Sequence, residues 1–132
     1  QSFNLLPLLT LEENVALPRV LQGASYAQAQ QEAAGWLGEV GLSGRQGHKP
    51  HQVSGGEMQR AAIARALINQ PAVILADEPT GNLDSATAAQ ILALFSHLHR
   101  QWGQTIILVS HAPEAGQAAD RVLRLADGRL LA

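Results

Sequence analysis

Apolar residues change their spacing along the chain near residue 71. Before that point they recur at helical spacing, as Trp36, Leu37 and Val40 do, and they predict helices over residues 10–21 and 24–40. After it, short apolar runs alternate with one long amphipathic stretch, which is typical of a parallel α/β sheet. The pattern therefore predicts a helical first part and a strand-helix-strand unit in the second.

Local signals predict where the helices of the first part begin and end. Thr10, followed three residues later by Glu13, has the spacing of a capping box, and Pro18 predicts a bend in the first helix. Gly41 predicts the end of the second helix. Residues 42–53 are rich in Gly, Ser, His, Lys and Pro and predict a surface loop, after which a third helix should follow residues 54–56.

The second part is predicted to contain two buried strands, at residues 73–76 and 105–109. Between them, residues 84–101 predict a helix that ends at Gly103. Near the C-terminus, Asp-Gly at residues 127–128 separates two short apolar runs and predicts a hairpin with a type I′ turn. The helix should bury one apolar face, which consists of Ala88, Ile91, Leu92, Phe95 and Leu98.

Composition narrows the possible functions. The 132 residues suit one domain, and a net charge of −2 with 15% charged residues lacks the basic excess of a nucleic-acid binder, so we predict no nucleic-acid partner. The absence of cysteine excludes disulfides and thiolate chemistry and fits a reducing cytosol. No apolar run approaches the ~20 residues that span a bilayer, so we predict no direct membrane insertion.

The first candidate site is Ser54-Gly55-Gly56-Glu57, which precedes an Ala-rich helical run. A capping serine and two glycines at a helix start present a hydroxyl and open backbone N–H groups to an anion, and the helix dipole favours negative charge there. This geometry predicts a phosphate site, with Gly56 exposed at the helix start. Taken alone, the motif is better explained as a helix cap beside a flexible turn.

The second candidate site follows the predicted strand at residues 73–76. Asp77 and Glu78 should emerge at the carboxyl edge of the sheet, where ligands of open α/β sheets bind. Asp77 is predicted to hold Mg²⁺ through water, and Glu78 to polarise an attacking water molecule. An acid pair at a strand end can also simply cap a turn or the next helix, but Ser110-His111 after the second strand favours the catalytic interpretation.

Several other residues are predicted to have no role in a functional site. His48 and His51 lie in a polar loop without further ligands and are interpreted as solvated residues. The two tryptophans are expected to pack at helix ends, and Arg60 and Arg65 to form a solvated or subunit-facing edge.

Together, the signature at residues 53–60, the run D-E-P-T-G-N-L-D at residues 77–84 and Ser110-His111 resemble the nucleotide-binding domains of ABC ATPases. Residues 1–15 resemble the Q-loop and first helix of the subfamily that serves lipoprotein release and macrolide export. The resemblance implies an α/β fold, the ABC-type P-loop NTPase with its RecA-like core. Residues 1–70 would form the Q-loop and helical subdomain with the signature helix, and residues 71–132 the C-terminal half of the parallel sheet.

The resemblance also implies roles for the matching residues. Glu78 and His111 would be catalytic, and Asp77 and Gln1 would serve the metal ion. The residues implied to meet the nucleotide of a partner protomer belong to the signature and the D-loop: Ser54, Gly55, Gly56, Glu57 and Asp84.

The implied function is ATP hydrolysis with Mg²⁺, which would power export or lipoprotein release. The implied partners are a second ATPase protomer, arranged head to tail, and transmembrane permease subunits. Such a protein would be cytoplasmic and peripheral to the inner face of the cell membrane.

Two features depart from the family pattern. Glu57 stands where the commonest signature has Gln and brings a negative charge near a triphosphate. No G-x-x-x-x-G-K-[ST] occurs, so the chain is interpreted as a fragment without the phosphate loop, inactive by itself. The alternatives are the C-terminal half of a DNA-repair or chromosome-maintenance ABC head, which a heptad-patterned coiled coil should precede, and a non-catalytic docking fragment.

Overall fold

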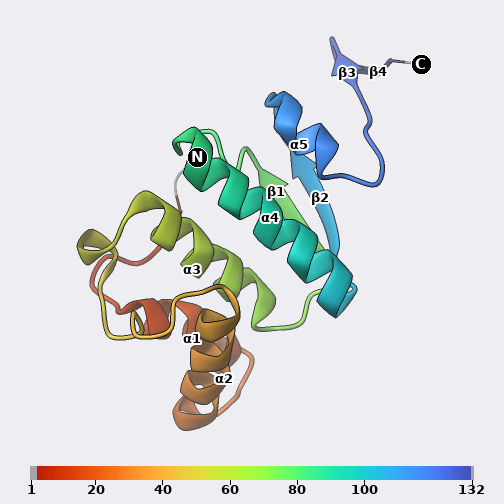
Figure 1. Cartoon of the computed structure of the whole chain (residues 1–132). Helices are drawn as coiled ribbons and strands as arrows, with labels where there is room; N and C mark the ends of the chain where they lie inside the picture. Colours follow the sequence, from red (N-terminus) through yellow and green to blue (C-terminus); the bar gives the residue numbers. More distant parts are fainter. Residues whose placement is uncertain (1–2, 132) are drawn as a thin grey trace.

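The computed structural model describes residues 3–131 and combines helices with a parallel sheet, as predicted. In Figure 1, the first three helices gather on one side, while the long fourth helix lies against the parallel strands. The elements, in chain order, are α1 (Leu11–Leu21), α2 (Tyr26–Glu39), the 3-10 helix η1 (Pro50–Gln52), α3 (Gly55–Leu67), β1 (Val73–Asp77), α4 (Ser85–Trp102), β2 (Thr105–Val109), α5 (Pro113–Gln117), β3 (Leu125–Ala126) and β4 (Arg129–Leu130).

The ends of the helices follow the local signals closely. At α1 the capping box is present, because the Thr10 hydroxyl accepts from the Glu13 N–H at 3.2 Å and the Glu13 carboxylate accepts from the Thr10 N–H at 2.7 Å. α4 begins after the cap residue Asp84 and ends at Gly103, whose φ of 63° is left-handed. α3 starts earlier than predicted, since Ser54 is its cap and both glycines form its first turn.

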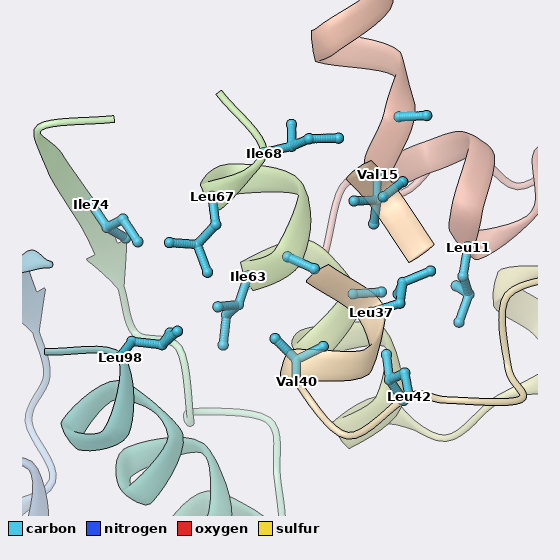
Figure 2. Packing of buried hydrophobic residues seen from close by; sticks show 14 of the residues in the cluster. Leu11, Val15, Leu37, Val40, Leu42, Ile63, Leu67, Ile68, Ile74 and Leu98 are labelled. Atoms are coloured by element: carbon cyan, nitrogen blue, oxygen red, sulfur yellow. The ribbon is translucent and has the colours of Figure 1, made fainter. Parts of the chain in front are cut away.

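One apolar cluster joins the two parts of the chain. Its members come from α1, α2 and α3 and continue into β1 and α4, where Ile74 and Leu98 take part. Figure 2 shows Leu67 and Ile63 of α3 lying between the α1–α2 side and these two residues. The predicted apolar face of α4 is confirmed at four of its five positions, Ile91, Leu92, Phe95 and Leu98, and Ala88 is half-buried.

The sheet consists of β1 and β2, which are parallel and in register from Val73 with Thr105 to Asp77 with Val109. The prediction of two buried strands is wrong. Leu75 is 76% exposed and Ile107 55% exposed, whereas Ile74 is buried. Because side chains alternate between the faces of a strand, the helical side covers only every second residue, and no described element covers the other face.

The loop between α2 and α3 is more structured than predicted. Leu42 and Pro50 are buried, and η1 forms within it. The loop is attached to α1, because the Leu11 N–H donates to the His48 carbonyl at 2.8 Å and the Glu12 N–H donates to the Gln46 carbonyl at 3.1 Å. Composition predicted an exposed segment, but these bonds hold the loop against the helical part.

The C-terminal hairpin is confirmed in kind but is short. β3 and β4 pair antiparallel over two residues each, and Asp127 and Gly128 both have positive φ, at 50° and 73°, as a type I′ turn requires. Figure 1 shows the hairpin standing away from the helices and the parallel sheet.

The two tryptophans do pack at helix ends, and they contact each other. Trp36 near the end of α2 and Trp102 at the end of α4 have ring centroids 5.2 Å apart. The Glu39 carboxylate accepts from the Trp102 indole N–H at 3.1 Å, and His97 Nε2 lies 2.8 Å from the same oxygen. Helix ends distant in sequence are thereby joined.

Candidate functional site

The candidate catalytic residues lie where β1 and β2 end. In a parallel pair the carboxyl ends meet at one edge, and here Asp77 is in register with Val109. The Glu78 N–H donates to the Val109 carbonyl at 2.9 Å, which extends the pairing by one bond. Glu78 then turns the chain sharply, with a left-handed φ of 45° that is unusual for a residue with a side chain.

This turn directs the Glu78 carboxylate toward the end of β2. Its Oε1 lies 2.7 Å from Nδ1 of His111 and accepts the His111 backbone N–H at 3.2 Å. The Glu78 side chain is 21% exposed, whereas that of His111 is 81% exposed. The two residues predicted to be catalytic therefore form a pair that is open to solvent on the histidine side.

The second carboxylate oxygen of Glu78 has a different environment. Oε2 is buried and has no hydrogen-bond partner within the described part of the chain. Leaving a buried acceptor unpaired costs free energy, so such an atom is typical of a position that a ligand or water serves. Nearby is a cavity of about 70 Å³ with Asp77 and Glu78 in its wall. The remaining wall residues are Phe3, Gln59, Pro79, Asn82 and Leu83.

The donor atoms around this cavity fit a hard cation only in part. Carboxylate and amide oxygens are suitable ligands for Mg²⁺, and Asp77, Glu78 and Gln59 offer them. Within residues 3–131, however, no three His, Asp or Glu side chains gather closely enough to hold a metal ion. A magnesium ion here would take its other ligands from water and a nucleotide, as this ion commonly does. Gln1, the other predicted metal ligand, lies outside the described residues.

The predicted phosphate site at the start of α3 forms a capping box. The Ser54 hydroxyl accepts from the Glu57 N–H at 3.2 Å, and the Glu57 carboxylate accepts from the Ser54 N–H at 2.8 Å. The other carboxylate oxygen pairs with Nε of Arg45 at 3.0 Å. The Ser54 backbone N–H holds the pKa of the Glu57 carboxyl below its ordinary value, and Arg45 lowers it further. Glu57 is therefore ionised, and both of its carboxylate oxygens accept hydrogen bonds at the start of α3.

Gly56 is buried, which corrects the expectation that it is exposed. A Cβ added to Gly56 would overlap Cγ2 of Thr87, so a side chain there would require Thr87 or α3 to shift. A Cβ at Gly55 would make ordinary contacts with Leu83 and Phe3. The two glycines thus differ: Gly56 is required by packing inside the chain.

Asp84 caps α4. The Thr87 hydroxyl donates to Oδ2 of Asp84 at 2.6 Å, and the Thr87 N–H donates to Oδ1 at 3.0 Å. These two bonds, the hydroxyl first, lower the pKa of the Asp84 carboxyl. The same threonine contacts Gly56, so the signature and the residue implied for the D-loop lie side by side.

Arg65 was expected to form a solvated or subunit-facing edge with Arg60, but its side chain is partly buried and bonded within the chain. Its guanidinium donates to the backbone carbonyls of Asn4 at 2.6 Å and Phe3 at 3.1 Å. Burial lowers the pKa of Arg65. The side chain fixes the N-terminal segment on α3, which brings Phe3 to the wall of the cavity.

Sequence reasoning missed the residues that complete the site. Phe3, Gln59 and Asn82 line the cavity, and Arg45 pairs with the signature. Gln59 belongs to the signature at residues 53–60 and could have been found there. Arg45 carried no signal, because it lies in an irregular loop twelve residues before its partner Glu57.

Comparison with protein families matches residues 1–81 to the family described as ABC transporter. This match covers more than half of the 132 residues. The chain belongs to the ABC transporter family.

Curated ABC transporter proteins align along almost the whole chain. An uncharacterised ABC transporter ATP-binding protein, YvrO of Bacillus subtilis, is 50% identical over 131 residues, which cover 99% of this chain and 57% of that protein. The lipoprotein-releasing system ATP-binding protein LolD of Bordetella avium is 48% identical over 131 residues, which also cover 99% of this chain and 57% of that protein. The macrolide export ATP-binding/permease protein MacB of Rhodopirellula baltica is 51% identical over 97% of this chain and 19% of its own length.

Solved ABC structures share the fold. The ATP-binding cassette MJ0796, in a dimeric post-hydrolysis state bound to ADP and Pi, superposes with a TM-score of 0.83 at 41% identity. The superposition covers 98% of this chain and 58% of the cassette. The predicted fold class, a P-loop NTPase of the ABC type, is therefore confirmed. In the described part of the chain, no helix is both long and apolar enough to cross a membrane.

Proposed function

We propose that the chain is part of a longer ATPase that powers an ABC transporter related to the LolD and MacB proteins. The observation that carries this proposal is the Glu78–His111 pair at the carboxyl edge of the sheet, beside a cavity that Asp77 lines. The longer protein is inferred because the chain covers 57% of the ATP-binding relatives and 58% of the solved cassette. Residues 1–70 are proposed as the helical subdomain and residues 71–132 as part of the RecA-like core.

In this proposal, Glu78 orients and polarises the water that attacks the γ-phosphate of ATP. The buried oxygen Oε2 of Glu78 can accept a hydrogen bond from this water molecule, while Oε1 is held by His111. A positioned general base contributes roughly 10²–10⁴ in rate. His111 would move from Glu78 to the γ-phosphate as the transferred charge develops.

Asp77 would hold Mg²⁺ through water, with Gln1 as a further contact. When bound, the ion would neutralise the negative charge on the phosphate oxygens. The role of the chain is to place Asp77 at the end of a strand whose position is fixed by the β1–β2 register.

The start of α3 would serve a second nucleotide, held by a partner protomer. Ser54 and Gly55 are exposed or half-buried at the helix N-terminus, where backbone N–H groups and the dipole favour phosphate. The solved relative MJ0796 is dimeric. We therefore propose a head-to-tail dimer with Asp84 near the dimer interface. The dimer would bind transmembrane permease subunits on the cytoplasmic face of the membrane.

The test uses the full-length protein that contains this sequence. Its ATP hydrolysis should require Mg²⁺ and should fall strongly in His111→Ala, because that variant loses the group beside the attacked phosphate. His97→Ala is the matched control, since His97 pairs with a carboxylate far from the cavity, and it should retain activity. Equal turnover in wild type and His111→Ala would exclude a catalytic role for the Glu78–His111 pair. A full-length protein without Mg²⁺-dependent turnover would favour the docking alternative.

A further inference from the structure

We propose that Arg45 is a positioning residue of the signature: it holds the Glu57 carboxylate in the cap and compensates its charge, which leaves Ser54 and Gly55 free to receive a triphosphate. The inference rests on the proposed function, in which the start of α3 meets nucleotide. It assigns a role to a loop residue that lies outside every motif.

The contacts of Glu57 divide its two oxygens between two tasks. Oε2 accepts the Ser54 N–H and closes the capping box, while Oε1 faces Nε of Arg45 at 3.0 Å. The Glu57 side chain is only 18% exposed, and that of Arg45 is 49% exposed. The carboxylate is thus largely enclosed, and the guanidinium covers it on the solvent side.

The backbone of Arg45 is fixed by its loop. The Arg45 N–H donates to the Leu42 carbonyl at 3.0 Å, and the His48 N–H donates to the Arg45 carbonyl at 3.0 Å. The same loop is bonded to the start of α1 through the His48 and Gln46 carbonyls. Arg45 therefore projects from an ordered turn, so only the conformational freedom of its side chain is lost when it meets Glu57.

Charge explains why this contact matters for a phosphate site. A glutamine at position 57 could close the same capping box without charge. Glutamate instead places a full negative charge beside the N–H groups that would face a polyanion, and like charges repel over such distances. The Arg45 guanidinium cancels that charge at a distance of 3.0 Å.

An exposed ion pair that only stabilises the loop would behave differently. Such pairs contribute little to folding, and their loss leaves ligand affinity unchanged. A positioning role instead predicts that the loss of Arg45 weakens triphosphate binding, and that removal of the Glu57 charge restores it.

The experiment uses the full-length protein that contains this sequence, labelled with ¹⁵N and titrated with inorganic triphosphate while the Gly55 and Gly56 amide signals are followed. Arg45→Ala should weaken the apparent affinity about fivefold or more, which corresponds to about 1 kcal/mol. Arg45→Lys should retain most of the affinity, and the double variant Arg45→Ala with Glu57→Gln should return close to wild type. Arg19→Ala breaks the comparable ion pair with Glu32, away from α3, and should bind as wild type does.

A second readout is the pH dependence of binding. In Arg45→Ala, affinity should rise as acid neutralises Glu57, whereas Arg45→Ala with Glu57→Gln should lack this rise. Equal affinity of wild type and Arg45→Ala would overturn the inference and leave the proposed function intact. If Arg45→Ala loses affinity and the added Glu57→Gln does not restore it, Arg45 does not act by compensating the charge of Glu57. Absence of any shift at Gly55 and Gly56 in wild type would overturn the phosphate role itself, and this inference with it.

Discussion

Nδ1 of His111 lies 2.7 Å from Oε1 of Glu78, although 33 residues separate them in the chain. The register of β1 and β2 brings the two strand ends together, and the left-handed backbone of Glu78 turns its side chain toward the end of β2. The contact leaves the other carboxylate oxygen buried and unpaired within the described residues. The Glu78–His111 pair thereby joins the two strand ends at the edge where we propose that ATP is cleaved.

In the full-length protein, Glu78→Gln should abolish turnover but preserve ATP binding and stabilise the closed dimer. The amide keeps the shape of the carboxylate but cannot act as a base, so a loss of about 10²–10⁴ in rate is expected. Steady-state hydrolysis and light scattering with ATP measure the two effects. Glu114→Gln, on the exposed part of α5, is the control. Near-normal turnover in Glu78→Gln would exclude Glu78 as the base.

Gly56→Ala should destabilise the chain by about 1–3 kcal/mol, because the new Cβ overlaps the Thr87 methyl and forces Thr87 or α3 to shift. A larger residue such as Asp should cost more, so loss of activity in Gly56→Asp would include a loss of fold. Urea denaturation measures the change. Gly55→Ala is the neighbouring control and should be nearly neutral, because its Cβ makes ordinary contacts.

Thr87→Ser should rescue Gly56→Ala, since serine removes the methyl group but keeps the hydroxyl that donates to Asp84. In a double-mutant cycle the two sites should therefore couple strongly. Additive effects would show that α3 relieves the overlap by some other movement.

Stability should fall as the pH drops below about 4.5, the ordinary pKa of a Glu carboxyl. The pKa of Glu57 and that of Asp84 are both lowered in the folded chain. A depressed pKa contributes stability above the unfolded value, and this contribution is lost as pH falls through the folded value. Thermal melting from pH 7 to pH 3 measures it. Glu57→Gln should flatten the profile, and an unchanged slope would show that Glu57 is not a source of the pH dependence.

The 132-residue chain should self-associate through the open face of the parallel sheet. A folded monomer of 14.0 kDa is expected to expose about 6,700 Å². This chain exposes 8135 Å², about 1,400 Å² more, which exceeds the roughly 800 Å² that each partner buries in a standard interface. Sedimentation should detect a dimer or a larger species. Leu75→Thr with Ile107→Thr should shift it toward monomer, while Leu8→Thr, exposed elsewhere, should not.

The same chain should neither hydrolyse ATP nor bind it tightly, because no G-x-x-x-x-G-K-[ST] sequence occurs in it to cradle the phosphates. Weak contact at the start of α3 remains compatible with this expectation. Isothermal titration with Mg-ATP measures the affinity. Micromolar binding by a well-folded monomer would contradict both this prediction and the preceding one.

The sequence by itself determined the elements and the family. Capping signals are local, so Thr10 with Glu13 predicted the start of α1, and Asp127-Gly128 predicted the hairpin turn. Motif order determined the resemblance to ABC ATPases, because the chemistry of ATP requires those residue types near particular strand and helix ends. Each cap and each motif occupies only a few consecutive residues, and the order of the motifs is read directly from the sequence.

Tertiary structure alone decided which residues meet and which are covered. The apolar runs of β1 and β2 predicted full burial, but burial depends on what packs on each face, and Leu75 is exposed. Gly56 had the pattern of an exposed helix start, but α4 approaches it, so Thr87 decides what fits there. Arg45 meets Glu57 only because the loop is bonded to α1. Such contacts join segments far apart in sequence, and local spacing carries no record of them.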